Sequence, residues 1–266
     1  SPLLFLDETS GLYGYVDRNG KEVIPAIYQD AKAFKDGYAV CCFDGQYGLV
    51  APNGRQYLFN YREILTLAED YHFYIGRRRG RTPDYVIYLN PLPAETEYND
   101  VELAFSKKGI IPVKKLGRYG YIGMDGKELE KPIFKHRLDF TSNDLALAET
   151  DEGYGVVNVR MEHVTNLNYP YGKKAEDGAF LLGRYENDFG VVNGEGKMSI
   201  EPGTYARTTY LEGFAMILAK TKDGFYTIID INGRVIVPKS ESIIVSEGVA
   251  IIKNGGEPQF LNLSTL

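Results

Sequence analysis

The chain has 266 residues, of which 44% are hydrophobic and 25% are charged, a composition that is ordinary for a folded globular protein. Its formal net charge of −6 argues against nucleic acid as the main partner, because binding to phosphates requires a basic face. No apolar stretch approaches the roughly 18 residues of a membrane-spanning helix, so we expect no membrane span.

The first segment of the chain contains three predicted strands, over residues 3–6, 12–16 and 23–25. Residues 17–21, Asp-Arg-Asn-Gly-Lys, join the second and third strands. This sequence suits a type I turn that a glycine in the left-handed region closes, the G1-bulge arrangement. A proline ends the third strand, since it cannot donate to the ladder. A short fourth element follows, whose type the sequence leaves open, with Tyr28, Ala31 and Phe34 as its apolar residues.

The same order of strands and turns recurs about every 35 residues along the whole chain, which is typical of a repeat architecture. Its clearest sign is an aromatic residue followed by glycine in the second strand. The clear copies are Tyr13-Gly14, Tyr47-Gly48, Tyr119-Gly120, Tyr154-Gly155 and Phe189-Gly190. Tyr85, Phe225 and Phe260 stand where weaker copies are expected.

These repeats predict an all-β fold of about seven antiparallel β-meander units plus a terminal hairpin, in one continuous domain over residues 1–266. Because the first unit already holds three strands and the chain finishes on a hairpin, we favour an open, curved solenoid. A closed seven- or eight-bladed propeller is the alternative. The expected units are residues 1–36, 37–70, 71–108, 109–143, 144–178, 179–213, 214–248 and 249–266.

The aromatic–glycine pairs have two interpretations. A large ring supplies much buried area, and glycine beside it allows another backbone or ring to approach closely. We favour a ladder of core rings, because a strand flanked on both sides lies centrally in its sheet. The alternative is a row of exposed platforms on which sugars stack.

The pattern resembles the WG-repeat (KWG-repeat) family of bacterial proteins, whose motif runs Trp-Gly-Tyr-Ile-Asp, Gly-Lys, Val-Ile-Pro, Tyr-Asp, Phe and Glu-Gly-Leu-Ala. Residues 13–17, 20–21, 23–25 and 36–39 match it in order, together with Tyr28 and Phe34, and residues 119–122 with 126–127 match again. Every family tryptophan is Tyr or Phe here. The resemblance implies a β-repeat array without a general catalytic activity, which serves as a binding or scaffold module, often of the cell envelope.

Residue types that could bind a metal or act in catalysis are scattered along the chain. The three histidines, His72, His136 and His163, lie in different units without metal-ligand spacing, so we expect no metal site. Cys41 and Cys42 are adjacent, and neighbours on a strand point to opposite faces, so a disulfide between them is not expected. We predict no catalytic residues and no cofactor.

The strongest departure from the repeat is a basic loop in the third unit, followed by further cations at the same turn of the fourth. Equivalent loops of adjacent units share one edge of an array, so these residues predict a basic patch for an anionic polymer, an acidic glycan or an acidic protein surface. The alternative is a set of solvated hairpin tips whose charges neutralise one another across units. In this case the acidic residues at the equivalent turn of the fifth unit, Glu149, Asp151 and Glu152, would balance the cations. The predicted patch is Arg77, Arg78, Arg79, Arg81, Lys114, Lys115 and Arg118, with Tyr71, Tyr74 and Tyr85 nearby.

A second departure is the polar, tyrosine-rich stretch of residues 166–171, which replaces the usual Val-Ile-Pro and aromatic. Tyr169 and Tyr171 make it a candidate sugar-binding loop, although Asn-Tyr-Pro-Tyr is equally good turn chemistry.

Together these features favour a noncatalytic module that presents an extended β-repeat surface to a protein or glycan partner. The alternative is a carbohydrate-active enzyme on a propeller-like frame, which would use a pair of the 36 acidic residues across one bond. Converging carboxylates in a deep pocket, one with a strongly raised pKa, would favour the enzyme. The family resemblance slightly favours the bacterial cell envelope or secretion. The oligomeric state is left open.

Overall fold

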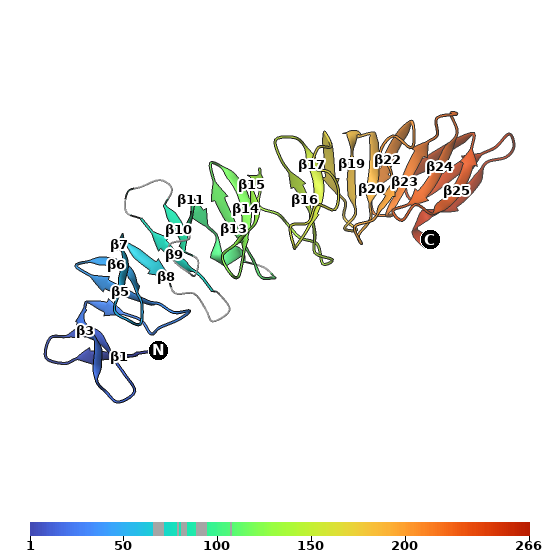
Figure 1. The fold of residues 1–266 in the computed structure, drawn as a ribbon. Helices are drawn as coiled ribbons and strands as arrows, with labels where there is room; N and C mark the ends of the chain where they lie inside the picture. The colour runs from blue at the N-terminus through green and yellow to red at the C-terminus, as the bar shows by residue number, and fades with distance from the viewer. Residues whose placement is uncertain (66–71, 79, 81–83, 89–94, 107) are drawn as a thin grey trace. The chain divides into compact units, whose positions relative to one another are not determined.

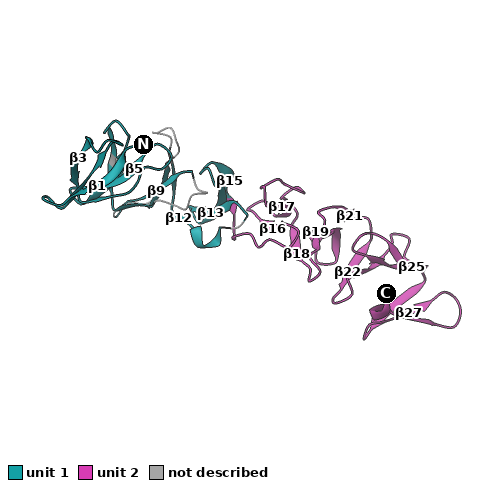
Figure 2. Cartoon of the chain, turned by 90° about the horizontal axis from the view of Figure 1, so that it is seen from below, with its two compact units in different colours: residues 1–132 teal, residues 133–266 magenta. Residues whose placement is uncertain are grey.

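The computed structural model describes residues 1–266 except 66–71, 79, 81–83, 89–94 and 107 (Figure 1). Its described elements are antiparallel strands and two short 3-10 helices, which confirms the predicted all-β class. The helices are single turns, so no described helix has the length or apolarity that crossing a membrane requires. The chain divides into two compact units, residues 1–132 and 133–266 (Figure 2).

Unit 1 contains four sheets in the described residues. Their strand orders are β1-β2-β3, β4-β5-β6-β7, β11-β10-β9-β8 and β12-β13-β14-β15, and β15 ends just past the boundary between the units. The elements are β1 (Leu3–Asp7), β2 (Leu12–Val16), β3 (Glu22–Tyr28), β4 (Asp30–Ala31), β5 (Ala39–Phe43), β6 (Gln46–Val50), β7 (Gln56–Tyr61), β8 (Glu63–Leu65), β9 (Tyr74–Arg77), β10 (Tyr85–Tyr88), β11 (Glu95–Tyr98), β12 (Asp100–Val101), η1 (Leu103–Phe105), β13 (Ile110–Lys115), β14 (Arg118–Gly123) and β15 (Glu128–Phe134).

Unit 2 also contains four sheets. Their orders are β16-β17, β18-β19-β20-β21, β22-β23-β24-β25 and β26-β27-β28. The elements are β16 (Leu145–Glu149), β17 (Tyr154–Asn158), β18 (Tyr171–Lys174), β19 (Phe180–Tyr185), β20 (Asp188–Val192), β21 (Met198–Ile200), β22 (Arg207–Leu211), β23 (Met216–Lys220), β24 (Tyr226–Asp230), β25 (Val235–Ser240), β26 (Ser242–Ser246), β27 (Val249–Lys253), β28 (Gln259–Asn262) and η2 (Leu263–Thr265). The strands β27 and β28 are the terminal hairpin that the sequence predicts.

The fourth element of the repeat is a short strand that pairs with the next repeat. In the first repeat this is β4, whose Asp30 and Ala31 lie opposite Cys42 and Cys41 of β5. A typical sheet therefore takes its first strand from one repeat and its other three from the next. This offset links each repeat to its neighbour through backbone pairing as well as through the core.

The turn between the second and third strands has the predicted geometry. The N–H of Gly20 donates to the carbonyl of Asp17 at 3.1 Å, and Gly20 has a φ of 78°. The Asp17 carboxylate accepts the N–H of Asn19 at 2.8 Å, which explains an acidic or amide side chain in this turn. Positive φ values recur at the matching glycines Gly54, Gly126, Gly196 and Gly233.

The glycine of the aromatic–glycine pair is required by a bulge in the third strand. Tyr13 and Tyr15 of β2 lie opposite Tyr28 and Ile24 of β3, so a step of two residues on one strand lies opposite a step of four on the other. The bulged backbone passes directly over Gly14, where a Cβ would lie 2.7 Å from the nitrogen of Ala26.

The third repeat supplies a natural comparison for this bulge. Val86 stands there in place of the glycine, and β10 pairs with β11 without a register shift. The third repeat thus lacks both the glycine and the bulge. In the seventh repeat Thr227 stands at this position beside a smaller register shift, where Tyr226 and Ile228 lie opposite Ser240 and Val237.

The ladder of buried rings lies elsewhere than expected. Four rings of the aromatic–glycine pairs, Tyr13, Tyr47, Tyr119 and Tyr154, are only half-buried, and only Phe189 is fully buried. Most of the fully buried rings lie two residues further along the second strand or at the end of the third strand, and Phe180 begins β19. The first two groups are Tyr15, Tyr28, Tyr98, Tyr121 and Phe134. The half-buried tyrosines keep their hydroxyls at the core margin, where Tyr47 donates to Asp30 at 3.1 Å.

The register also corrects the two weakest copies of the pair. In the seventh repeat Tyr226, not Phe225, lies at the aromatic position, opposite Lys220. In the eighth repeat Phe260 lies opposite Ile251 and is 68% exposed, so it is not a core ring.

The hydrophobic cores lie between the faces of successive sheets within each unit (Figure 1). Leu181 of β19 and Ile217 of β23, for example, are buried in one cluster with Phe189. A sheet that is covered in this way places its edges and hairpin tips at the surface, and these are the positions available for binding.

Candidate functional site

The two described arginines of the predicted basic loop are held by acids of their own sheet. Arg77 lies 3.6 Å from Glu63 of β8, and its guanidinium is 5.7 Å from the centre of the Tyr85 ring. Arg78 lies 2.6 Å from Glu97 of β11. Burial acts to lower the pKa of Arg78, but hydrogen bonds to Glu97 and Tyr61 outweigh it and raise that pKa. Arg79, Arg81 and Tyr71 of the same prediction lie outside the described residues.

The cations of the fourth repeat lie on the β13–β14 hairpin. The Lys114 amine is 5.3 Å from the centre of the Tyr119 ring, and Lys115 lies opposite Arg118 at the last pair before the turn. Lys115 is exposed, and Leu116 at the tip is 87% exposed. Lys115 and the tip of this hairpin are therefore exposed, and Arg77 and Arg78 contact acids of their own sheet.

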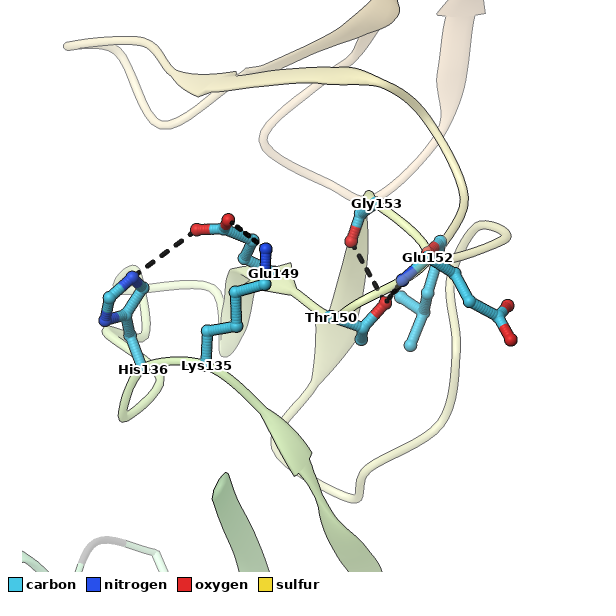
Figure 3. A network of polar contacts seen from close by, with 7 residues as sticks. Lys135, His136, Glu149, Thr150, Glu152 and Gly153 are labelled. Atoms are coloured by element: carbon cyan, nitrogen blue, oxygen red, sulfur yellow. Dashed lines mark hydrogen bonds and ion pairs between the residues drawn. The ribbon is translucent and has the colours of Figure 1, made fainter. Parts of the chain in front are cut away.

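One acid of the fifth repeat, Glu149, belongs to a local network of polar contacts in unit 2 (Figure 3). The Glu149 carboxylate accepts a hydrogen bond from the Lys135 amine at 2.9 Å and lies 3.4 Å from His136 Nε2. The hydrogen bond from Lys135 holds the pKa of Glu149 below its usual value. At the next turn, the Thr150 hydroxyl donates to the carbonyl of Gly153 at 3.1 Å and accepts the N–H of Glu152 at 3.2 Å.

The tyrosine-rich stretch of residues 166–171 lies beside a sheet in which only β16 and β17 are described as strands. Tyr169 exchanges two backbone hydrogen bonds with Tyr154, at 2.8 and 3.0 Å, and packs against the core. Tyr171 begins β18 of the following sheet. The two tyrosines therefore belong to different sheets, and only Tyr171 reaches the groove described next.

A groove of about 580 Å³ lies in unit 2 between the sheet of β18–β21 and the sheet of β22–β25. This volume is within the range of ligand clefts, roughly 300–1,000 Å³. Its wall comes from β18, from the tip of the β19–β20 hairpin and from β22. The lining residues are Tyr171, Lys173, Leu181, Tyr185, Glu186, Asn187, Arg207, Thr208, Thr209, Tyr210 and Glu212.

Three tyrosines line this groove, and they differ in exposure. Tyr185, at the hairpin tip, is 67% exposed, while Tyr171 and Tyr210 are half-buried. Burial raises the pKa of Tyr171. Burial and then a hydrogen bond to Asp177 raise the pKa of Tyr210, whose hydroxyl donates to that carboxylate at 2.9 Å. The rings of Tyr171 and Tyr210 are thus neutral at physiological pH, and a hydrogen bond to Asp177 orients Tyr210.

The base of the groove is held by Thr208, a buried residue on β22. Its N–H donates to the carbonyl of Asn187 at 2.9 Å, and its hydroxyl accepts the N–H of Phe189 at 3.0 Å. These bonds join β22 to the β19–β20 hairpin. The Lys173 amine donates to Glu212 at 2.6 Å across the groove, and this bond raises the pKa of Lys173. The walls are therefore fixed before any ligand binds.

Four further polar side chains of the groove are exposed and unengaged. Within the described part of the chain, no hydrogen bond or ion pair engages the side chains of Glu186, Asn187, Arg207 or Thr209. The lining carries two basic side chains, Lys173 and Arg207, and two acidic ones, Glu186 and Glu212, so its formal charge is balanced.

Tyr185 and Arg207 were missed by sequence reasoning, although Tyr185 carried a signal. The matching turns of the second and fourth repeats contain glycine, at Gly45 and Gly117, whereas the sixth repeat has Arg-Tyr-Glu-Asn over residues 184–187. A large aromatic residue at a hairpin tip, in place of the usual glycine, is a departure of the kind that marks a binding position. Arg207 had no comparable local signal.

Residues suited to metal binding are dispersed over the part of the chain that the structure describes. No cluster of three His, Cys, Asp or Glu side chains there could hold a metal ion. Cys41 and Cys42 are both free and buried on β5, and burial raises the pKa of the Cys41 thiol to about 12. Among the described carboxyl groups, each pKa shift that is resolved is downward, at Asp7, Glu149, Glu162 and Asp223.

Comparison with known proteins places one repeat in a family. The model of the WG containing repeat matches residues 13–47, which confirms the resemblance drawn from the sequence. No curated protein matches the chain.

Among solved structures, the chain is similar to one described as the eukaryotic initiation factor, with 8% identity, a TM-score of 0.32, and coverage of 96% of this chain and 78% of that one. It is also similar to BamB from Moraxella catarrhalis, with 12% identity, a TM-score of 0.26, and coverage of 82% and 76%. A third similarity is to apo AztD from Citrobacter koseri, with 10% identity, a TM-score of 0.28, and coverage of 96% and 89%.

Proposed function

We propose that this WG-repeat-containing chain is a noncatalytic binding module, and that its protein or glycan partner occupies the groove between β18–β21 and β22–β25. One observation supports this function above the others. An exposed aromatic side chain, Tyr185, stands in a concave surface beside unengaged polar groups, among them Arg207 and Asn187. An exposed aromatic residue among a few convergent polar groups is typical of recognition sites.

The chemistry of the groove favours binding over catalysis. A glycosidase of the usual kind needs one carboxylic acid that stays protonated near neutral pH, and such a group requires a raised pKa. Glu212, one of the two carboxylates in the lining, is paired with Lys173 at 2.6 Å. That ion pair raises the pKa of Lys173, so the lysine stays charged.

The repeat frame suits this role, because stacked sheets hold their hairpin tips in place without needing a catalytic centre. The end of the β13–β14 hairpin, where Lys115 is exposed, offers a further surface for scaffold contacts. The family resemblance favours a bacterial protein of the cell envelope or a secreted one.

Array binding tests this proposal. The wild-type chain and the Tyr185→Ala, Arg207→Ala double variant are applied to a glycan array and to a peptide array. Phe260→Ala is the matched control, because Phe260 is 68% exposed, as Tyr185 is at 67%, and does not line the groove. We expect at least one ligand that the double variant loses and the control keeps. If every ligand is kept by the double variant, or if no ligand binds, the groove is not the site. Cleavage of a bound glycan would favour the enzyme alternative.

A further inference from the structure

We infer that the ligand of this groove is a neutral oligosaccharide. This inference rests on the proposed binding function and specifies its ligand class. It draws on four properties of the groove: its aromatic rings, its planar hydrogen-bonding groups, its charge balance and the engagement of its strand edge at Thr208.

The rings suit the apolar face of a sugar. A pyranose carries C–H groups on one face, and an aromatic ring provides a flat apolar surface for them. Tyr185 supplies such a surface at the tip of the β19–β20 hairpin, and Tyr171 supplies a second at the start of β18. A tyrosine loses little conformational entropy when a ligand orders it, since it has two side-chain torsions.

The polar groups suit the hydroxyls at the ring edge. Arg207 offers a planar fork of donors, Glu186 offers only acceptors, and Asn187 offers both. Each sugar hydroxyl donates one hydrogen bond and accepts others, so a ligand with neighbouring hydroxyls can use all three side chains. A phosphate or carboxylate ligand could use only the donors.

The charge of the groove favours a neutral ligand over an anionic one. Lys173 and Glu212 neutralise each other at 2.6 Å, which leaves Arg207 and Glu186 as one cation and one anion. An anionic polymer would meet the carboxylate of Glu186 as well as the guanidinium of Arg207. The groove thus lacks the excess of positive charge that attracts polyanions.

The strand edge beside the groove disfavours a peptide. An extended peptide is commonly recognised by pairing with an open edge strand through its backbone. At Thr208 the outer edge of β22 is already engaged, because the N–H of this residue donates to the carbonyl of Asn187 at 2.9 Å. A sugar does not need that edge, since it is bound through side chains.

Calorimetric titration tests the inference with named probes: the hexasaccharides of cellulose, chitin, xylan, mannan and starch. We expect at least one to bind the wild-type chain, with a dissociation constant that changes less than twofold between low and high salt, because screening acts on charged ligands. Tyr185→Ala should weaken that binding by about tenfold or more, the equivalent of about 1.4 kcal/mol. Tyr185→Phe should preserve it, because the ring remains, and Phe260→Ala should leave it unchanged.

Arg207→Lys distinguishes a hydrogen-bonding fork from a simple charge. Lysine keeps the charge but loses the planar fork, so a neutral sugar should bind several-fold more weakly, whereas an anionic ligand should be retained. Unchanged melting of the Tyr185 and Arg207 variants confirms that their folds are intact.

The outcomes separate this inference from the proposed function. If none of the hexasaccharides binds, or if binding survives Tyr185→Ala, the neutral-sugar inference is wrong. If the array ligands lost by the groove double variant are all peptides or anionic polymers, the binding function stands and only the ligand class is overturned. If no ligand of any class depends on the groove, both fail.

Discussion

Replacing Gly190 with alanine tests the link between the aromatic–glycine pair and the bulged strand. A Cβ at this position would lie 2.2 Å from the carbonyl oxygen of Ile200 and 2.5 Å from the nitrogen of Pro202. Ordinary contacts of a Cβ begin at 3.4 Å, so the backbone of β21 would have to retreat by about 1.2 Å, the difference between 3.4 and 2.2 Å. Both neighbours are backbone atoms, which cannot escape by rotating a side chain.

The expected cost follows from the contacts that this movement disturbs. The retreat separates β20 from β21 at Val191 and Ile200, where the strands are paired. Losing two ladder hydrogen bonds costs about 1 kcal/mol each, and residual strain adds about 2 kcal/mol. Alanine offsets about 0.7 kcal/mol by restricting the unfolded chain. We therefore expect Gly190→Ala to destabilise unit 2 by about 3 kcal/mol, a large part of the roughly 5–15 kcal/mol that stabilises a domain.

Urea unfolding followed by circular dichroism measures this cost, and hydrogen exchange of the β19–β21 amides locates it. The second measurement is needed because repeat arrays can unfold in parts. Gly256→Ala is the matched control: nothing lies within 4 Å of its added Cβ, and we expect a change below about 0.5 kcal/mol. Equal unfolding midpoints and equal exchange for Gly190→Ala and Gly256→Ala would refute the steric argument.

Four further expectations follow from the structure and the repeat. Val86 replaces the glycine in the third repeat and is fully buried. Val86→Ala should therefore lower the free energy of unfolding in urea by about 2 kcal/mol. An unchanged free energy would contradict the buried, regularly paired position of Val86. Lys135 lowers the pKa of Glu149, so the charged carboxylate stabilises the fold above its unfolded pKa, and this stability is lost as pH falls through the folded pKa. Between about pH 5 and 3 the wild type should therefore lose more stability than Glu149→Gln. An equal dependence of unfolding free energy on pH in the two proteins would contradict the Lys135–Glu149 interaction. Burial raises the pKa of Cys41 to about 12, so iodoacetamide at about pH 8 should label it only after denaturation, and rapid labelling of the native chain would show that the site is open. Small-angle scattering should show an elongated particle if the repeats form an open array, while a compact disc would support a closed ring.

The local features of this protein were predictable because short-range chemistry determines them. The Asp-Arg-Asn-Gly-Lys turn needs only a glycine at positive φ and a carboxylate that caps it, and Gly20 and Asp17 provide both. The period of about 35 residues likewise follows from the sequence and predicts stacked β units. The short fourth strand was less clear, because the two residues of β4 are paired by β5, which follows them by several residues.

The candidate site could be predicted only in part. Tyr171 was predicted as a binding residue because its segment departs from the repeat, and it lines the groove. Tyr169, which was predicted together with it, packs against a different core cluster. The cations of the third repeat looked accessible in the sequence, yet Arg78 lies 2.6 Å from Glu97, nineteen positions further along the chain. Ion pairs of this kind depend on which strands lie side by side. A run of arginines in the sequence does not show which acidic residues will contact it.

The sequence by itself determined the all-β class, the repeat period, the turn chemistry and the need for glycine at one position of each clear repeat. The tertiary structure decided what that glycine is for, which rings are buried and where a ligand can bind. The physical reason is the range of the interactions. Turns and strand periodicity depend on neighbouring residues. The bulge over Gly14 and the presence of Tyr185 and Arg207 in one groove depend on how separate strands and sheets pack together.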